Sequence, residues 1–230
     1  MDDNFFYELE QCFTKARFSV YKQDGASNVI ALARYLYNIE LCKALYAVLN
    51  VFEITFRNKI NEALKTFAQQ DNWYDSIQLD KSSMIKIGDA KNKIKMRGKE
   101  PTHDRIIAEL TLGFWSSLLT TRYSQSKFQS HIIRSCLQKC PKSEKSIKNI
   151  QKRFDKIRIL RNRVSHYERI IHWKDLEEQH AHLLECINWL DEAAYALIGK
   201  IDRFEHVYLG GLSPFVSLVE ENWNTLNRTP

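Results

Sequence analysis

Glycine and proline are scarce in this chain of 230 residues, which has seven glycines and four prolines. Together they make up less than half of the share of about 12% that an average protein has. A protein built of β-sheets needs these residues in its many turns. The prolines lie between helix-like segments or at the end of the chain: Pro101, Pro141, Pro214 and Pro230. We therefore predict an all-α fold, a helical bundle with additional helices.

Long apolar runs and a regular cysteine framework are also missing. No apolar stretch approaches the 18 or so residues of a membrane span, and 27% charged with 44% hydrophobic residues excludes a disordered tail. Five cysteines without regular spacing fit a reducing compartment. The first residues, MDDNFFYELEQC, lack the basic region and cleavage site of a signal peptide. We expect a cytoplasmic protein that does not associate with membranes.

Charge is unevenly distributed along the chain, whose net charge is +6. The segment from Ser126 to Arg163 holds twelve basic residues and two acidic ones, whereas the segment from Lys174 to the end holds four basic and ten acidic residues. A concentrated basic block favours a surface for a polyanion. Lysines that merely solvate a long helix would give the same pattern, and on charge alone both interpretations stand.

Helical periodicity dominates the first third of the chain. Ser27 is a candidate N-cap, and no glycine or proline occurs between Ser27 and Gln70. Because a single helix of that length is unusual, we expect a turn near Tyr37–Asn38. Apolar side chains recur every three or four residues and predict one buried stripe: Leu41, Leu45, Val48, Phe52, Phe56, Ile60, Leu64 and Phe67.

The rest of the chain is expected to add shorter helices within a single domain over residues 1–230. Residues 72–101 carry two glycines and scattered lysines, which indicates short helices and a partial loop insertion, mobile at 96–101. The last helix should bury apolar residues as far as Leu197. Further helices are predicted to begin near Thr102, Lys127, Ser143 and Asp175.

Motifs for cofactors and metals are absent. The chain has no Gly-rich phosphate loop and no nucleophile elbow. Cys136 and Cys140 lie one helical turn apart near His131, but no fourth zinc ligand has a suitable spacing. We therefore expect no metal and no cofactor. Trp115 is expected in the core. For Trp73 two interpretations stay open, a core residue or a platform on which a base stacks.

The sharpest candidate site is Arg161-Asn162-Arg163-Val164-Ser165-His166. A histidine four to six residues after an arginine occurs about once by chance in such a chain, and Arg97 with His103 forms a second pair. Only the first pair has an asparagine directly after the arginine, and Ile157 and Leu160 extend its apolar helical face. Taken alone, the motif is better explained by an interhelical cap and a surface histidine than by a catalytic site.

Three ordered blocks supply further context. The first contains Ala33–Glu40 and Phe52–Asn58, the second is Ala108–Trp115, and the third is Leu160–Glu168. In this order they resemble the Abi-like (abortive infection, AbiD/AbiF) family of the HEPN ribonuclease superfamily, whose signature is the arginine and histidine of the third block. The family usually has a second histidine where Tyr167 stands here.

The resemblance implies an HEPN-type helical bundle that cleaves RNA without a metal ion, in abortive-infection antiviral defence or as a toxin. It also implies a composite active site formed by two protomers and, for some relatives, association with a structured small non-coding RNA. The catalytic residues implied for this chain are Arg161, Asn162 and His166.

The chemistry of these residues suits such a reaction. The 2′-hydroxyl of RNA attacks the neighbouring phosphorus, so the substrate supplies its own nucleophile and DNA is spared. The protein has to move protons and stabilise charge on the phosphoryl oxygens. His166 is the candidate general acid or base, and Arg161 is the candidate phosphate clamp. The expected products carry 2′,3′-cyclic phosphate and 5′-hydroxyl ends.

Helix geometry adds two expectations. On an ideal helix Arg161 and His166 lie about 140° apart, so the helix has to end or distort between them. Asn162, four residues before His166, is placed to orient the imidazole. One chain offers a single such histidine for both the acid and the base role, which favours a homodimer with two-fold symmetry.

Two further groups of polar residues complete the hypothesis. Glu53, Arg57 and Asn58 are expected to support Arg161, and the alternative is an ordinary ion pair between Glu53 and Arg57. The basic block supplies the expected RNA-binding residues: Lys127, Arg134, Lys145, Lys148, Lys152, Arg153, Lys156 and Arg163. Two other functions stay open, a non-catalytic protein in complex with a structured small non-coding RNA and a helical interaction module without nucleic acid.

Overall fold

The computed structural model describes residues 4–226, and within them all regular secondary structure is helical, which confirms the all-α prediction. Three short 3₁₀ turns, η1 (Gln23–Gly25), η2 (Trp73–Asp75) and η3 (Thr121–Tyr123), lie between the α-helices. The α-helices are α1 (Asn4–Phe13), α2 (Lys15–Ser19), α3 (Asn28–Ala68), α4 (Lys81–Met96), α5 (His103–Glu109), α6 (Leu112–Ser117), α7 (Lys127–Cys136), α8 (Ile147–Ser165), α9 (Leu176–Leu190), α10 (Glu192–Ile198), α11 (Phe204–Gly210) and α12 (Ser213–Leu226). No helix in this described range is long and apolar enough to span a membrane.

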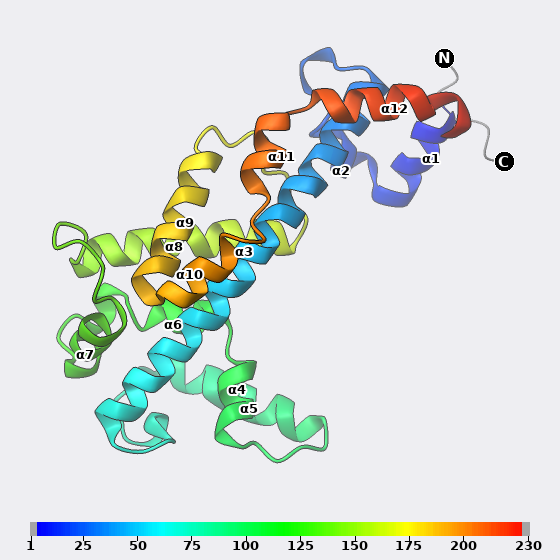
Figure 1. The fold of residues 1–230 in the computed structure, drawn as a ribbon. Coiled ribbons are helices and arrows are strands. Elements are labelled where there is room, and N and C mark those ends of the chain that lie inside the picture. The colour runs from blue at the N-terminus through cyan, green and yellow to red at the C-terminus, as the bar shows by residue number, and fades with distance from the viewer. Residues whose placement is uncertain (1–3, 227–230) are drawn as a thin grey trace. The chain divides into compact units, whose positions relative to one another are not determined.

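Helix α3 is continuous over 41 residues, so the expected turn near Tyr37–Asn38 is wrong (Figure 1). The helix begins as predicted, with the Ser27 hydroxyl accepting a hydrogen bond from the Ile30 N–H at 3.3 Å. Asparagine interrupts a helix when its side chain competes for the local backbone. The Asn38 amide is instead occupied by a distant segment, residues 168–171, and nothing else in α3 breaks the helix.

The region expected to be a partial loop insertion contains one long helix, α4, instead of several short ones. Asp80 caps its N-terminus by accepting from the Ser83 N–H at 2.8 Å. Burial alone would raise the pKa of Asp80, but hydrogen bonds from Ser83, Tyr123 and Arg122 outweigh that effect and hold the pKa at about 2. Irregular chain follows from Arg97, with Gly98 in the left-handed region at φ +68°.

Two expectations about buried apolar residues are also wrong. Phe67, the last member of the predicted α3 stripe, is 37% exposed because it lies in the last turn of the helix. The last long helix is interrupted at Asp191, which caps α10 by accepting from the Ala194 N–H at 2.9 Å. Leu197 beyond this break is exposed.

The chain forms two compact units. Unit 1 comprises the described residues of Met1–Ala47, Asn162–His180 and Ile201–Pro230, and unit 2 comprises Val48–Arg161 and Ala181–Lys200. Helices α3, α8 and α9 each contribute residues to both units. The single domain expected over residues 1–230 stays a prediction.

Each unit has its own aromatic core. In unit 1, Phe6 and Phe18 pack edge to face at 5.2 Å, and Val219 and Trp223 of α12 belong to the same cluster. In unit 2, Phe56 stacks on Phe154 at 4.7 Å. The expected core position of Trp115 is confirmed, since it is fully buried.

Trp73 is a core residue as well, which decides between the two interpretations left open for it. Its side chain is fully buried, and its indole N–H donates to the Asn61 side-chain oxygen at 2.9 Å. A base cannot stack on a ring that solvent does not reach, so Trp73 is not a stacking platform.

Candidate functional site at the end of helix α8

Helix α8 ends directly before His166, in a Schellman motif. The Glu168 N–H donates to the Arg163 carbonyl at 2.9 Å, and the Tyr167 N–H donates to the Val164 carbonyl at 3.1 Å. Tyr167 occupies the left-handed position at φ +53°, where glycine is usual. The α4 terminus uses the same pair of hydrogen bonds with Gly98 in that position. The helix therefore ends between Arg161 and His166, one of the two options required by their spacing.

The chain after His166 is fixed by residues of unit 1. The Arg17 guanidinium donates to the Tyr167 carbonyl at 2.7 Å. The buried Asn38 side chain donates to the Glu168 carbonyl at 3.2 Å and accepts from the Ile170 N–H at 2.7 Å. These contacts hold the backbone on the C-terminal side of His166 and so define where its side chain leaves the chain.

The His166 side chain is exposed, and within residues 4–226 no hydrogen bond, ion pair or ring contact engages its imidazole. The backbone N–H of His166 donates to the backbone carbonyl of Asn162 at 3.1 Å. The Asn162 side chain is also exposed, and the orienting hydrogen bond expected between it and the imidazole is not formed. The imidazole is available to a ligand.

A hollow of about 310 Å³ lies within unit 1, and its lining includes Ser165 and Tyr167, the two residues that flank His166 in the chain, but not His166 itself. Tyr46 and Tyr167 line it and are 59% and 63% exposed. Lys43 contributes as well, with its ammonium paired to Glu40 at 2.6 Å. Cys42 is a buried member of the lining, and burial raises the pKa of its thiol to about 11. The full lining is Cys42, Lys43, Tyr46, Val164, Ser165 and Tyr167. Two exposed phenol rings around a hollow of this size suit a planar ligand such as a base.

Arg161 lies in unit 2, where Glu53 holds its guanidinium. The Arg161 Nε–H donates to Glu53 Oε2 at 2.9 Å, and an Nη2–H donates to Glu53 Oε1 at 3.4 Å. Arg57 does not pair with Glu53 and donates instead to the Asn58 side chain at 3.1 Å. A guanidinium has five N–H groups, so three remain to bind a phosphate while Glu53 fixes its plane.

The expected RNA-binding residues fall into two groups. Arg153 is only 14% exposed, pairs with Glu185 at 2.5 Å and lies over the Trp189 ring at 4.6 Å. Arg163 is paired with Glu168. Lys145 contacts the Gln138 carbonyl at 3.5 Å, and Lys156 is half-buried. The second group consists of exposed cations that form no ion pair within the described chain: Lys127, Arg134, Lys148 and Lys152.

Some residues of the basic block therefore pair with residues of the acidic segment inside unit 2. Glu185 and Glu192 of the acidic segment pair with Arg153 and Lys139 of the basic block. The polyanion surface expected from the sequence is smaller than the number of basic residues indicates.

The cysteines near His131 are packed into the structure. The Cys136 thiol donates to the Lys59 carbonyl at 3.2 Å, and burial raises the pKa of the thiol to about 11. Among residues 4–226 no three His, Cys, Asp or Glu side chains are arranged to hold a metal ion.

Comparisons of the chain with protein-family models, with curated proteins and with solved structures return no match. The functional interpretation therefore depends on the residues and contacts described above. Sequence reasoning missed Arg17, Asn38 and Tyr46 as parts of this site. Asn38 could have been found from the sequence, because it is a polar residue between apolar ones on a predicted helix. Nothing in the sequence distinguishes Tyr46 from other surface tyrosines.

Proposed function

We propose that the protein is a metal-independent endoribonuclease of the HEPN type. The observation that carries the proposal is the placement of His166, exposed and without a side-chain partner in the described chain, at a helix end that Arg17 and Asn38 fix in position. General acid–base catalysis needs a side chain that can reach the reacting proton, and a free imidazole on a fixed backbone can meet this need. The adjacent hollow with its two tyrosines offers a place for a base next to the scissile phosphate.

Arg161 supplies the charge stabilisation. Its pairing with Glu53 orients the guanidinium before substrate binds and leaves three N–H groups for the phosphoryl oxygens. His166 takes the proton from the 2′-hydroxyl as this group attacks phosphorus, and the P–O5′ bond breaks. The leaving oxygen needs a proton from a second acid. A second protomer would supply it from its own histidine, which is why we propose a homodimer.

The similarity of the three sequence blocks to the Abi-like family supports a role in antiviral defence or as a toxin. In that setting a resident structured RNA would bind the same basic residues that bind substrate.

Incubation of the purified protein with end-labelled single-stranded RNA tests the proposal. We expect cleavage in the presence of EDTA, products with 2′,3′-cyclic phosphate ends, and no cleavage at a linkage whose 5′-side nucleotide lacks the 2′-hydroxyl. Cleavage of the 2′-deoxy linkage would contradict the mechanism. Co-purified RNA without any cleavage would favour the non-catalytic RNA-binding protein instead.

A further inference from the structure

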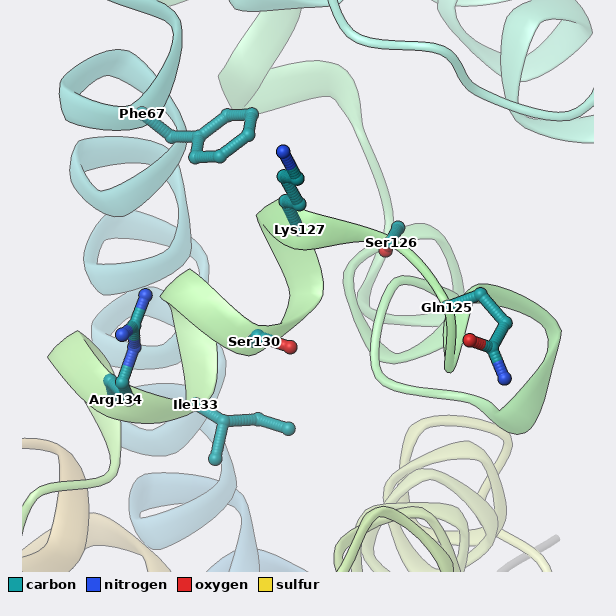
Figure 2. Close-up of a pocket in the computed structure, with 7 residues that line it drawn as sticks. All are labelled: Phe67, Gln125, Ser126, Lys127, Ser130, Ile133 and Arg134. Atoms are coloured by element: carbon teal, nitrogen blue, oxygen red, sulfur yellow. The ribbon is translucent and has the colours of Figure 1, made fainter.

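A second concave surface lies in unit 2, between the end of α3 and α7. It has a volume of about 550 Å³ and is lined by Phe67, Gln125, Ser126, Lys127, Ser130, Ile133 and Arg134. Figure 2 shows the Phe67 ring on α3 and the Lys127 side chain pointing into the same space, with Arg134 further along α7. We call this surface the α7 groove.

The α7 groove is positively charged and contains no acidic residue in its lining. Lys127 and Arg134 are exposed, and neither forms an ion pair within residues 4–226. They are seven residues apart, which is about 10 Å along a helix axis. This spacing suits contacts with two phosphates of one strand.

Phe67 gives the α7 groove an exposed aromatic surface. Its ring packs against His131 of α7 with centroids 5.7 Å apart, so it is held in place although it is 37% exposed. Aromatic rings fixed beside a basic groove are the platforms on which single-stranded nucleic acids stack their bases. Gln125 and Ser130, both exposed, add neutral hydrogen-bonding groups to the same lining.

We infer that the α7 groove binds single-stranded RNA, with one base stacked on Phe67 and the flanking phosphates bound by Lys127 and Arg134. The inference rests on the proposed function only in taking RNA as the ligand. It adds a second contact with the strand, in a different unit from His166. Two unpaired cations beside an exposed aromatic ring favour a nucleic acid strand over a protein partner.

The test measures binding of a short, fluorescein-labelled single-stranded RNA of mixed sequence to the full chain carrying His166→Ala, by fluorescence anisotropy across a range of KCl concentrations. We expect Phe67→Ala to raise Kd about 5- to 100-fold without changing the slope of log Kd against log salt. Phe67→Trp should retain the affinity. The double variant Lys127→Gln/Arg134→Gln should reduce the salt slope by about 1.4.

Matched controls come from the same unit. Tyr195 is 42% exposed on α10, so Tyr195→Ala removes a comparable aromatic ring elsewhere. Lys86 and Lys95 are exposed cations of α4, so Lys86→Gln/Lys95→Gln removes the same charge. Thermal unfolding of every variant is measured to check that the fold is retained.

The outcomes separate this inference from the proposed function. If the wild-type chain cleaves RNA but the Phe67 and charge variants bind as tightly as the controls, the α7 groove is not an RNA site and the ribonuclease proposal stands. If the variants lose binding as expected but the wild-type chain does not cleave, the inference stands and the ribonuclease proposal is wrong. An acidic polypeptide that competes as well as RNA, or affinity retained in Phe67→Leu, overturns the inference.

Discussion

Substitution of Asn38 by alanine perturbs the connection between helix α3 and the segment that follows His166. The Asn38 side chain is 2% exposed. Its oxygen accepts from the Ile170 N–H at 2.7 Å and from the Ile171 N–H at 3.4 Å, and its amide donates to the Glu168 carbonyl at 3.2 Å. Alanine removes all three interactions and leaves backbone groups without partners.

The expected loss follows from these contacts. The two shorter hydrogen bonds contribute about 1 kcal/mol each, and leaving the buried Ile170 N–H unsatisfied costs about 1 kcal/mol more. We predict that Asn38→Ala lowers the free energy of unfolding by about 3 kcal/mol. For a chain of this size that corresponds to a fall in Tm of about 10 °C.

Urea and thermal unfolding followed by helical circular dichroism measure this change. The matched control is Asn50→Ala, which removes an exposed asparagine from the same helix and should be neutral or slightly stabilising because alanine favours helices. A loss below about 1 kcal/mol in Asn38→Ala would refute the conclusion that this side chain fixes the segment after His166. RNA cleavage by Asn38→Ala, assayed well below its Tm, should also be reduced.

Three further predictions concern other positions. Glu53→Gln should lower kcat/KM for RNA cleavage about 10- to 100-fold, because Arg161 loses its orienting charge, while unfolding changes by less than about 1 kcal/mol; an unchanged rate would contradict the role of the pair. Tyr167→Gly should raise the free energy of unfolding by about 0.5 kcal/mol, because glycine adopts positive φ without strain, yet should slow cleavage by removing a ring from the hollow; a destabilised variant would contradict the first part. The pKa of Asp80 is about 2 in the folded chain and near 4 in an unfolded one. The ionised Asp80 carboxylate therefore stabilises the folded chain fully above about pH 4, and this stabilisation is lost as pH falls toward 2. It amounts to about 1–2 kcal/mol after solvent screening. Acid unfolding of Asp80→Asn, which keeps the cap, should lack this pH-dependent component.

The helical fold follows from the sequence because its signals are local. Scarce glycine and proline, the Ser27 cap and the periodic apolar positions of α3 each act within a few residues. The break expected at Asn38 was wrong for the opposite reason, since the groups that occupy its amide are 130 or more residues away in the chain. Phe67 fits the apolar period of α3 but lies in its last turn, and the period does not reveal that the ring is left exposed.

In the candidate site, too, the local features could be predicted from the sequence, whereas the contacts between distant residues could not. The spacing of Arg161 and His166 showed that the helix has to end or distort between them, and α8 ends at Ser165. The sequence left Glu53 two possible arginine partners, and the choice of Arg161 depends on the packing of α3 against α8 within unit 2. The hollow combines Tyr46 with Tyr167, and no local pattern brings these two residues together.

The rate of RNA cleavage by the wild-type chain compared with His166→Ala tests the central claim most directly. The control is His206→Ala, since His206 is an exposed histidine on α11 of unit 1. If His166 transfers the proton, His166→Ala should lower kcat by at least about 100-fold with an unchanged Tm, and His206→Ala should cleave at the wild-type rate. Equal rates for the wild-type chain and His166→Ala would contradict the assignment of His166 as the catalytic acid or base.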